Sequence, residues 1–136
     1  MKRMIPILLM MTLLLTGCAA PKPATEANTY RQITMQEAVE MMEKEENYII
    51  LDVRTHEEFA AGHIPGAIVI PNETIGTEDI PQLPHKDQLI MVYCRSGNRS
   101  KQASDKLVKL GYTNIVEFGG INSWPGETVV GMESSI

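Results

Sequence analysis

The chain has 136 residues, with 12 Lys or Arg against 17 Asp or Glu, and a formal net charge of −5 at pH 7. This length fits one folded domain once any targeting segment is set aside. The acidic balance argues against nucleic acid as a partner and against adhesion to anionic lipid headgroups through a basic patch.

The N-terminal residues have the pattern of a secretory signal. Two cations precede a long apolar run that ends at the small residues Thr16 and Gly17, directly before Cys18. A charged segment, an apolar segment and a small-residue cleavage site are the parts of a signal peptide. An uncleaved membrane anchor is the alternative, and the shortness of the apolar run argues against it. We therefore predict a signal peptide over residues 1–17.

The end of this run, Leu15-Thr16-Gly17-Cys18, resembles the bacterial lipobox. The resemblance implies cleavage before Cys18 and attachment of acyl chains to that residue. Several acyl chains hold a protein on a membrane far more firmly than one chain does. We expect a lipoprotein of the cell envelope, anchored to the membrane through lipid on Cys18, with its domain outside the cytoplasm.

The rest of the chain divides into a tether, a domain and a tail. Residues 18–30 are rich in Ala, Pro, Thr and Asn and have no hydrophobic periodicity, which predicts a flexible tether. A single folded domain is predicted over residues 31–126. Residues 127–136 carry no recognisable pattern and are predicted as a C-terminal tail.

The domain begins with a helix and a strand. Thr34 and Glu37 have the spacing of a capping box, and the apolar residues that follow share one helical face. We expect a helix over residues 35–46. The apolar run at residues 48–53 is rich in β-branched residues and predicts a strand buried on both faces.

A second helix and a second strand come next. Thr55 and Glu58 repeat the capping-box spacing, and Gly62 is placed to end the short helix that they begin. A turn and an apolar strand are expected within residues 63–71. Three prolines exclude a long helix from residues 72–86, which are predicted as a loop.

The second half of the domain continues this alternation. Residues 89–93 predict a third apolar strand, and an apolar stripe beginning after residues 97–100 predicts a helix that ends near Gly111. Residues 114–118 predict a further strand, and residues 119–124 a short turn or helix. Strands that alternate with helices predict an α/β fold with a mostly parallel central sheet and helices on both faces.

Cys94 follows the strand at residues 89–93, at the start of a loop that leads into the next helix. The carboxyl end of a strand beside a helix start is the usual ligand site of an open α/β sheet. Free N–H groups and partial positive charge at a helix start stabilise a thiolate, and nearby arginines lower the pKa of a cysteine further. The residues expected to form an anion-attracting loop around Cys94 are Arg95, Ser96, Gly97, Asn98, Arg99 and Ser100.

Other roles for the Cys94 thiol remain open. An acylated Cys18 cannot pair with it, so an exported chain keeps one thiol that is reactive, paired with another protein or buried and inert. A cysteine–histidine dyad formed through the fold, with His63, is a further alternative. No metal site is predicted, because one thiol and scattered histidines lack ligand spacing.

Three segments, taken together and in this order, have the pattern of family signatures. They are LDVRTHEEFAAGHIPGA at Leu51–Ala67, VYCRSGNRS at residues 92–100 and FGGINSW at residues 118–124. Together they resemble the signatures of the single-domain rhodanese family of sulfurtransferases. The resemblance extends from Ile33 to Trp124, nearly the whole predicted domain.

The resemblance implies transfer of sulfur through a persulfide on Cys94. The thiolate would attack the outer sulfur of thiosulfate, release sulfite and pass the bound sulfur to cyanide or a thiol. The implied partners are a small anionic sulfur donor and a thiol or cyanide acceptor, and no cofactor is expected. Arg95 and Arg99 would attract the dianion, with Arg99 in direct contact because it ends the loop. Since an exported thiolate can oxidise, a thiol-reductase partner is a further hypothesis.

Charged residues of the first signature and the length of the loop refine this prediction. Asp52, Arg54 and Glu58 are expected to form ion pairs and caps that hold the loops around the site. Related phosphatases and arsenate reductases place an arginine six positions after the cysteine, whereas Arg99 is five positions after Cys94, which favours sulfur transfer. The other alternative is a sulfur-carrier or protein-docking module without thiosulfate turnover, and the presence of Cys94 favours the enzyme.

Overall fold

A computed structural model describes residues 28–132 of the chain. The predicted signal peptide, Cys18 and residues 19–27 of the predicted tether lie outside the described residues, as do residues 133–136 of the predicted tail. Within residues 28–132, no helix combines the length and the apolar character needed to cross a membrane.

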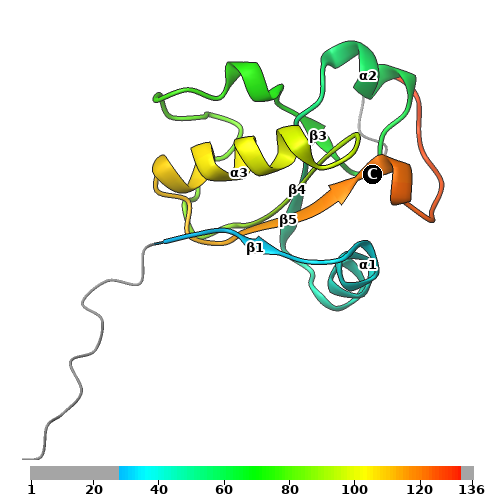
Figure 1. Ribbon diagram of the computed structural model, residues 1–136, viewed down its shortest axis with the longest axis horizontal. Coiled ribbons are helices and arrows are strands. Elements are labelled where there is room, and N and C mark those ends of the chain that lie inside the picture. Colours follow the sequence, from blue (N-terminus) through cyan, green and yellow to red (C-terminus); the bar gives the residue numbers. More distant parts are fainter. Residues whose placement is uncertain (1–27, 133–136) are drawn as a thin grey trace, which may run out of the picture.

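A five-stranded sheet forms the centre of the domain, in the order β1-β5-β4-β2-β3 (Figure 1). All four neighbouring pairs are parallel, as the alternation of strands and helices predicts. The central position of β4 agrees with its continuous apolar sequence. The strands are β1 (Arg31–Gln32), β2 (Tyr48–Asp52), β3 (Ile68–Val69), β4 (Leu89–Cys94) and β5 (Ile115–Gly120).

Helices cover both faces of this sheet. Alternate residues of β4 enter opposite cores, with Ile90 and Val92 on one face and Met91 and Tyr93 on the other. The first core is completed by α3 (Asn98–Lys109), and the second by α1 (Met35–Lys44) and α2 (His56–Ala61). Figure 1 shows α3 crossing the sheet on the side away from α1. The predicted α/β fold is therefore confirmed.

The predicted helix starts are also confirmed. Both Thr34 before α1 and Thr55 before α2 cap their helices, and in each capping box the glutamate three residues later returns a hydrogen bond. Helix α1 ends at Lys44, two residues before the expected end, because Glu45 already has an extended backbone.

Some short elements differ from the prediction. The edge strand β1 was not predicted, because its two residues are exposed and carry no apolar signal. The loop at residues 72–86 contains one turn of 3-10 helix, η1 (Asn72–Thr74). A second such turn, η2 (Ile121–Ser123), directly follows β5 within the segment predicted as a turn or helix.

The first residues of the predicted tail pack on the domain. Val129 exchanges two backbone hydrogen bonds with His63, both of 2.9 Å, and Gly131 donates one to the carbonyl of Ala60. This C-terminal strap, residues 127–131, therefore runs from η2 to α2 (Figure 1). Ordered contacts of the domain extend beyond the predicted boundary at residue 126.

Candidate active site

Cys94 is the last residue of the central strand, at the carboxyl edge of the parallel sheet. A register shift between Val92 and Cys94 sets Cys94 opposite Gly120 of β5. The chain then turns through residues 95–97 into α3. The strand end and the helix start therefore meet at the sulfur, as the sequence predicts for a ligand site.

Backbone amides surround the Cys94 sulfur. The N–H group of Gly97 donates to Sγ at 3.0 Å, and the Ser100 hydroxyl oxygen lies 3.5 Å from Sγ. Burial by itself would raise the pKa of Cys94, but hydrogen bonds from the Ser100 side chain and from the Ser100, Gly97 and Ser96 amides outweigh it. The pKa of Cys94 is therefore lowered, which favours the nucleophilic thiolate.

Two glycines permit this loop to close. Gly97 has a left-handed backbone, with φ of 112°, that turns its N–H group towards Cys94. Gly120 lies so close to the loop that a Cβ atom there would collide with the Arg95 carbonyl group and would come within 2.6 Å of the Ser96 nitrogen. The loop therefore depends on a close backbone contact with β5, and this contact leaves no room for a side chain at residue 120.

Exposure separates the loop residues into two groups. Cys94 is only 1% exposed, and Ser100 is fully buried. Arg95, Ser96 and Asn98 are exposed, and Arg99 is half-buried. The thiol is thus buried, but the amides around it point towards the sulfur, which an inert core cysteine does not require.

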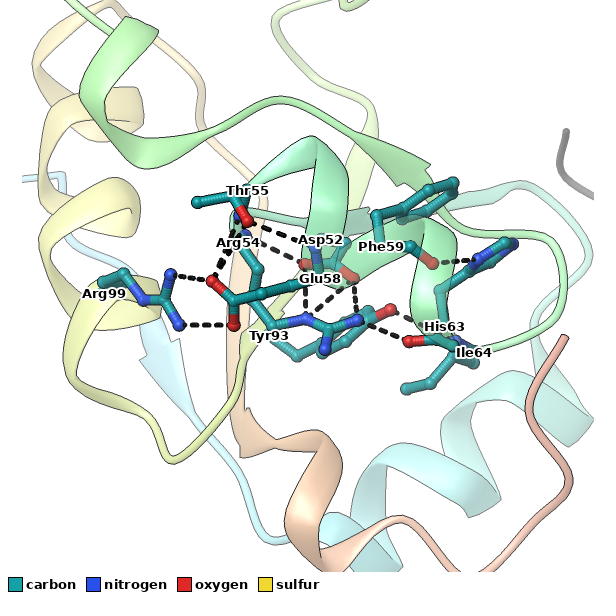
Figure 2. Close-up of polar contacts among 10 residues, drawn as sticks. Asp52, Arg54, Thr55, Glu58, Phe59, His63, Ile64, Tyr93 and Arg99 are labelled. Atoms are coloured by element: carbon teal, nitrogen blue, oxygen red, sulfur yellow. Dashed lines mark hydrogen bonds and ion pairs between the residues drawn. The ribbon is translucent and has the colours of Figure 1, made fainter. Parts of the chain in front are cut away.

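Arg99 makes a bidentate ion pair with Glu58 of α2, shown in Figure 2. The two N–O distances are 2.7 and 3.0 Å. Hydrogen bonds from Arg99 lower the pKa of Glu58 to about 2, although partial burial opposes the shift. Glu58 therefore has two roles, because it also closes the capping box of α2. Direct contact between Arg99 and a substrate stays a prediction.

Asp52 and Arg54 form a buried ion pair beside this site (Figure 2). Arg54 Nη2 lies 2.7 Å from Asp52 Oδ2 and also donates to the Gly62 carbonyl at 2.7 Å. The pair thereby links the end of β2 to the end of α2. Burial, and then the charge of Asp52, raise the pKa of the neighbouring Tyr93, whose hydroxyl accepts from the Ile64 amide.

His63 belongs to the turn after α2. Its ring stacks on Phe59 at 3.6 Å, and Nδ1 lies 2.9 Å from the Phe59 carbonyl oxygen (Figure 2). Its Nε2 atom is buried without a hydrogen-bond partner. Within residues 28–132 no hydrogen bond joins a histidine to Cys94, so the geometry gives no support to the dyad.

Glu117 is the polar residue of this region that the sequence analysis missed. It is 2% exposed in β5, and its Oε1 atom accepts hydrogen bonds from Ser100 Oγ at 2.6 Å and from the Gly119 amide at 2.9 Å. The sequence did contain one sign of this residue, because Glu117 is a single charged residue between Val116 and Phe118 in an otherwise apolar strand. Across the described part of the chain, no group of three or more potential metal ligands is present.

The fold and the cysteine loop have counterparts among known proteins. The model of the Rhodanese-like domain family matches residues 34–127. Thiosulfate sulfurtransferase PspE of Escherichia coli is 35% identical over 71 residues, which cover 52% of this chain and 68% of that protein. Thiosulfate sulfurtransferase GlpE of Pseudomonas entomophila is 31% identical over 107 residues, covering 75% of this chain and 94% of that protein.

Solved structures agree with the family match. A rhodanese-like domain from Anabaena superposes with a TM-score of 0.67 at 27% identity, covering 79% of this chain and 85% of that one. A rhodanese from Escherichia coli superposes with a TM-score of 0.56 at 34% identity. The match covers 62% of this chain and 99% of that chain. The chain, with a parallel α/β domain and a cysteine at the carboxyl edge of its sheet, belongs to the rhodanese-like family.

Proposed function

We propose that this protein is a sulfurtransferase that moves sulfane sulfur from thiosulfate, or another persulfide donor, through Cys94 to cyanide or a thiol. Two similar proteins are named thiosulfate sulfurtransferases. The observation that carries the proposal is the Gly97 amide 3.0 Å from Sγ of a cysteine whose pKa is lowered. Such a sulfur is ready to act as a nucleophile.

The proposed reaction has two displacements at sulfur. The Cys94 thiolate attacks the outer sulfur of thiosulfate, the S–S bond of thiosulfate breaks, and sulfite leaves with the bonding electron pair. The acceptor then attacks the terminal sulfur of the persulfide, which releases the Cys94 thiolate. With cyanide as the acceptor the product is thiocyanate. The loop amides that face Sγ are the donors available to stabilise the charge on sulfur in both states.

The full chain, purified in mild detergent, tests this proposal. Thiocyanate formation from thiosulfate and cyanide is expected in the parent and is expected to disappear in Cys94→Ser. Cys18→Ser is the matched control, because it removes the other cysteine and should leave turnover unchanged. Turnover that survives Cys94→Ser would exclude the persulfide route.

A sulfur-carrier role is the second candidate, and a specific similarity favours it. The putative sulfur carrier protein YrkF of Bacillus subtilis is 29% identical over 103 residues, which cover 75% of this chain and 55% of that protein. A persulfide that forms on Cys94, seen by mass spectrometry, without thiosulfate-to-cyanide turnover would favour the carrier over the enzyme.

The proposed location is the cell envelope, with the membrane anchor on Cys18. Mass spectrometry of the protein from its native membrane should find acyl chains on an N-terminal Cys18. The same spectrum would show an additional sulfur on Cys94 if the protein is charged in the cell. An N-terminus at Met1 without acyl mass would contradict the anchor. The proposal includes a partner that reduces thiols, because a thiolate outside the cytoplasm can be oxidised and must then be reduced again.

A further inference from the structure

Arg95 and Arg99 are the two cations of the cysteine loop, and the structure gives them different surroundings. Arg99 is half-buried, and both of its terminal nitrogens bond the Glu58 carboxylate, at 2.7 and 3.0 Å. Arg95 is exposed and forms no salt bridge with any residue in the range 28–132. A guanidinium group paired at two points presents little of its charge to a third group. Arg95 is therefore the cation that remains available to an anion at the loop.

The charges around the thiol give the site little attraction for a dianion. Hydrogen bonds to Glu58 raise the pKa of Arg99 against the effect of burial, and the charges of Cys94 and Glu73 raise it further by smaller amounts. Both of these acidic groups therefore lie near the Arg99 guanidinium. The Arg99–Glu58 pair is neutral as a unit, and the Cys94 thiolate offsets the single positive charge of Arg95. A donor with two negative charges thus meets more repulsion at the reacting sulfur than a donor with one.

Glu58 is held in place from its own helix. It closes the capping box of α2, and its Oε1 atom lies 3.3 Å from the Thr55 hydroxyl oxygen. Figure 2 shows the Arg99 side chain extended from α3 to this carboxylate. The pair therefore fixes the direction of the guanidinium as well as neutralising its charge. A donor must break both bonds to Glu58 before it can contact Arg99.

We propose that Glu58 is a positioning residue that holds Arg99 away from the donor and thereby sets the donor charge that the site prefers. The preferred class is a sulfane sulfur donor with one negative charge, an organic thiosulfonate, over the doubly charged thiosulfate. The Cys94 thiolate attacks the outer sulfur of the thiosulfonate, the S–S bond breaks, and the sulfinate leaves with the bonding electron pair. The two donors react at the same atom and differ by one charge.

Donor preference in the full chain, purified in mild detergent, tests this inference. Thiosulfate and methanethiosulfonate carry two and one negative charges, and kcat/KM is measured for each as thiocyanate formation with cyanide. Glu58→Gln should raise the ratio of kcat/KM for thiosulfate to that for methanethiosulfonate by about tenfold, mainly through a lower KM for thiosulfate, because Arg99 becomes available to the additional charge. Comparing this ratio between variants cancels the difference in intrinsic reactivity between the donors.

The chain offers a matched control for this substitution. Glutamine at residue 58 can still close the capping box, so α2 keeps its start. Glu57→Gln removes the same charge from the adjacent, exposed residue and should leave the donor ratio of the parent. An equal fall in kcat/KM for both donors in Glu58→Gln would overturn the inference, because a pair that only holds the loop in place does not distinguish donors by charge.

A double-mutant cycle separates the release of Arg99 from the loss of a nearby negative charge. Glu58→Gln is repeated in a chain that carries Arg99→Gln. If Glu58 acts by occupying Arg99, the donor ratio should no longer change when Glu58 is replaced in this background. A change of the same size without Arg99 would overturn the inference, because it would show that Glu58 acts through its own charge alone.

The inference rests on the proposed sulfur transfer, but alkylation of Cys94 provides a readout that does not need it. In the full chain carrying Cys18→Ser, Cys94 is the remaining cysteine. Its rates with iodoacetate and iodoacetamide compare an anion with a neutral reagent of similar size. Glu58→Gln should raise the ratio of the first rate to the second, and only when Arg99 is present. A raised ratio without thiocyanate formation would contradict only the proposed function, whereas thiocyanate formation with both ratios unchanged would contradict only the inference.

Discussion

At the scale of single residues, two ion pairs link the elements around Cys94 and differ in burial. Arg99–Glu58 is partly exposed, with 28% and 31% of the side chains accessible, whereas Asp52–Arg54 is almost completely buried. Partial exposure allows solvent to screen the first pair, while the second loses nearly all of its hydration. The two pairs should therefore respond differently to pH and to substitution.

The Arg99–Glu58 pair should make stability depend on pH in the acid range. The pKa of Glu58 is lowered to about 2 in the folded protein, from about 4.5 in the unfolded chain. Its contribution is therefore present above pH 4.5 and is lost as pH falls towards 2. After allowance for solvent screening we expect about 1 kcal/mol. Urea unfolding of the parent and Glu58→Gln should show a difference in stability at pH 6 that shrinks by pH 2.5; a constant difference would contradict this assignment.

The Asp52–Arg54 pair should be costly to break from one side. Arg54→Met removes the partner of a fully buried carboxylate and should lower the free energy of unfolding by about 3 kcal/mol. Asp79→Asn is the control, because it breaks a pair with Lys86 in which the aspartate is 92% exposed, and it should leave the urea midpoint close to that of the parent. Equal urea midpoints for the two variants would show that Asp52 finds another partner.

At the scale of elements, the contact between β5 and the cysteine loop fixes the position of the thiol. Gly120→Ala places a methyl group against Arg95 and Ser96, so the loop must move. We expect loss of most sulfur-transfer activity and a destabilisation of about 1–3 kcal/mol. Gly76→Ala is the matched control, since no heavy atom lies within 4 Å of a Cβ atom there, and it should resemble the parent in both assays. Normal turnover in Gly120→Ala would show that the loop tolerates displacement.

The elements also show which features are readable from sequence. Apolar runs and capping boxes placed β2, β4, α1 and α2, because burial and helix starts leave local patterns. Strand β1 left none, since two exposed residues gain their structure only by pairing with β5. Glu117 was missed for the same reason, because its role depends on Ser100, which is distant in sequence and becomes a neighbour only through the order of the sheet.

At the scale of the whole molecule, the C-terminal strap joins parts of the domain that flank the site. It leaves η2, which follows β5, and reaches the turn after α2, where Val129 pairs with His63. Helix α2 in turn supplies Glu58 to Arg99. The strap thus connects both sides of the carboxyl edge of the sheet (Figure 1).

The strap should therefore unfold together with the domain. Val129→Pro removes the N–H group that donates to the His63 carbonyl at 2.9 Å, and the loss of this bond should cost about 1 kcal/mol. For a domain of this size that corresponds to a fall in Tm of about 5 °C. Val130→Ala, at a side chain 75% exposed, should keep the parent Tm. An unchanged Tm in Val129→Pro would mean that residues 127–131 detach before the domain unfolds, and that α2 holds Glu58 against Arg99 without them.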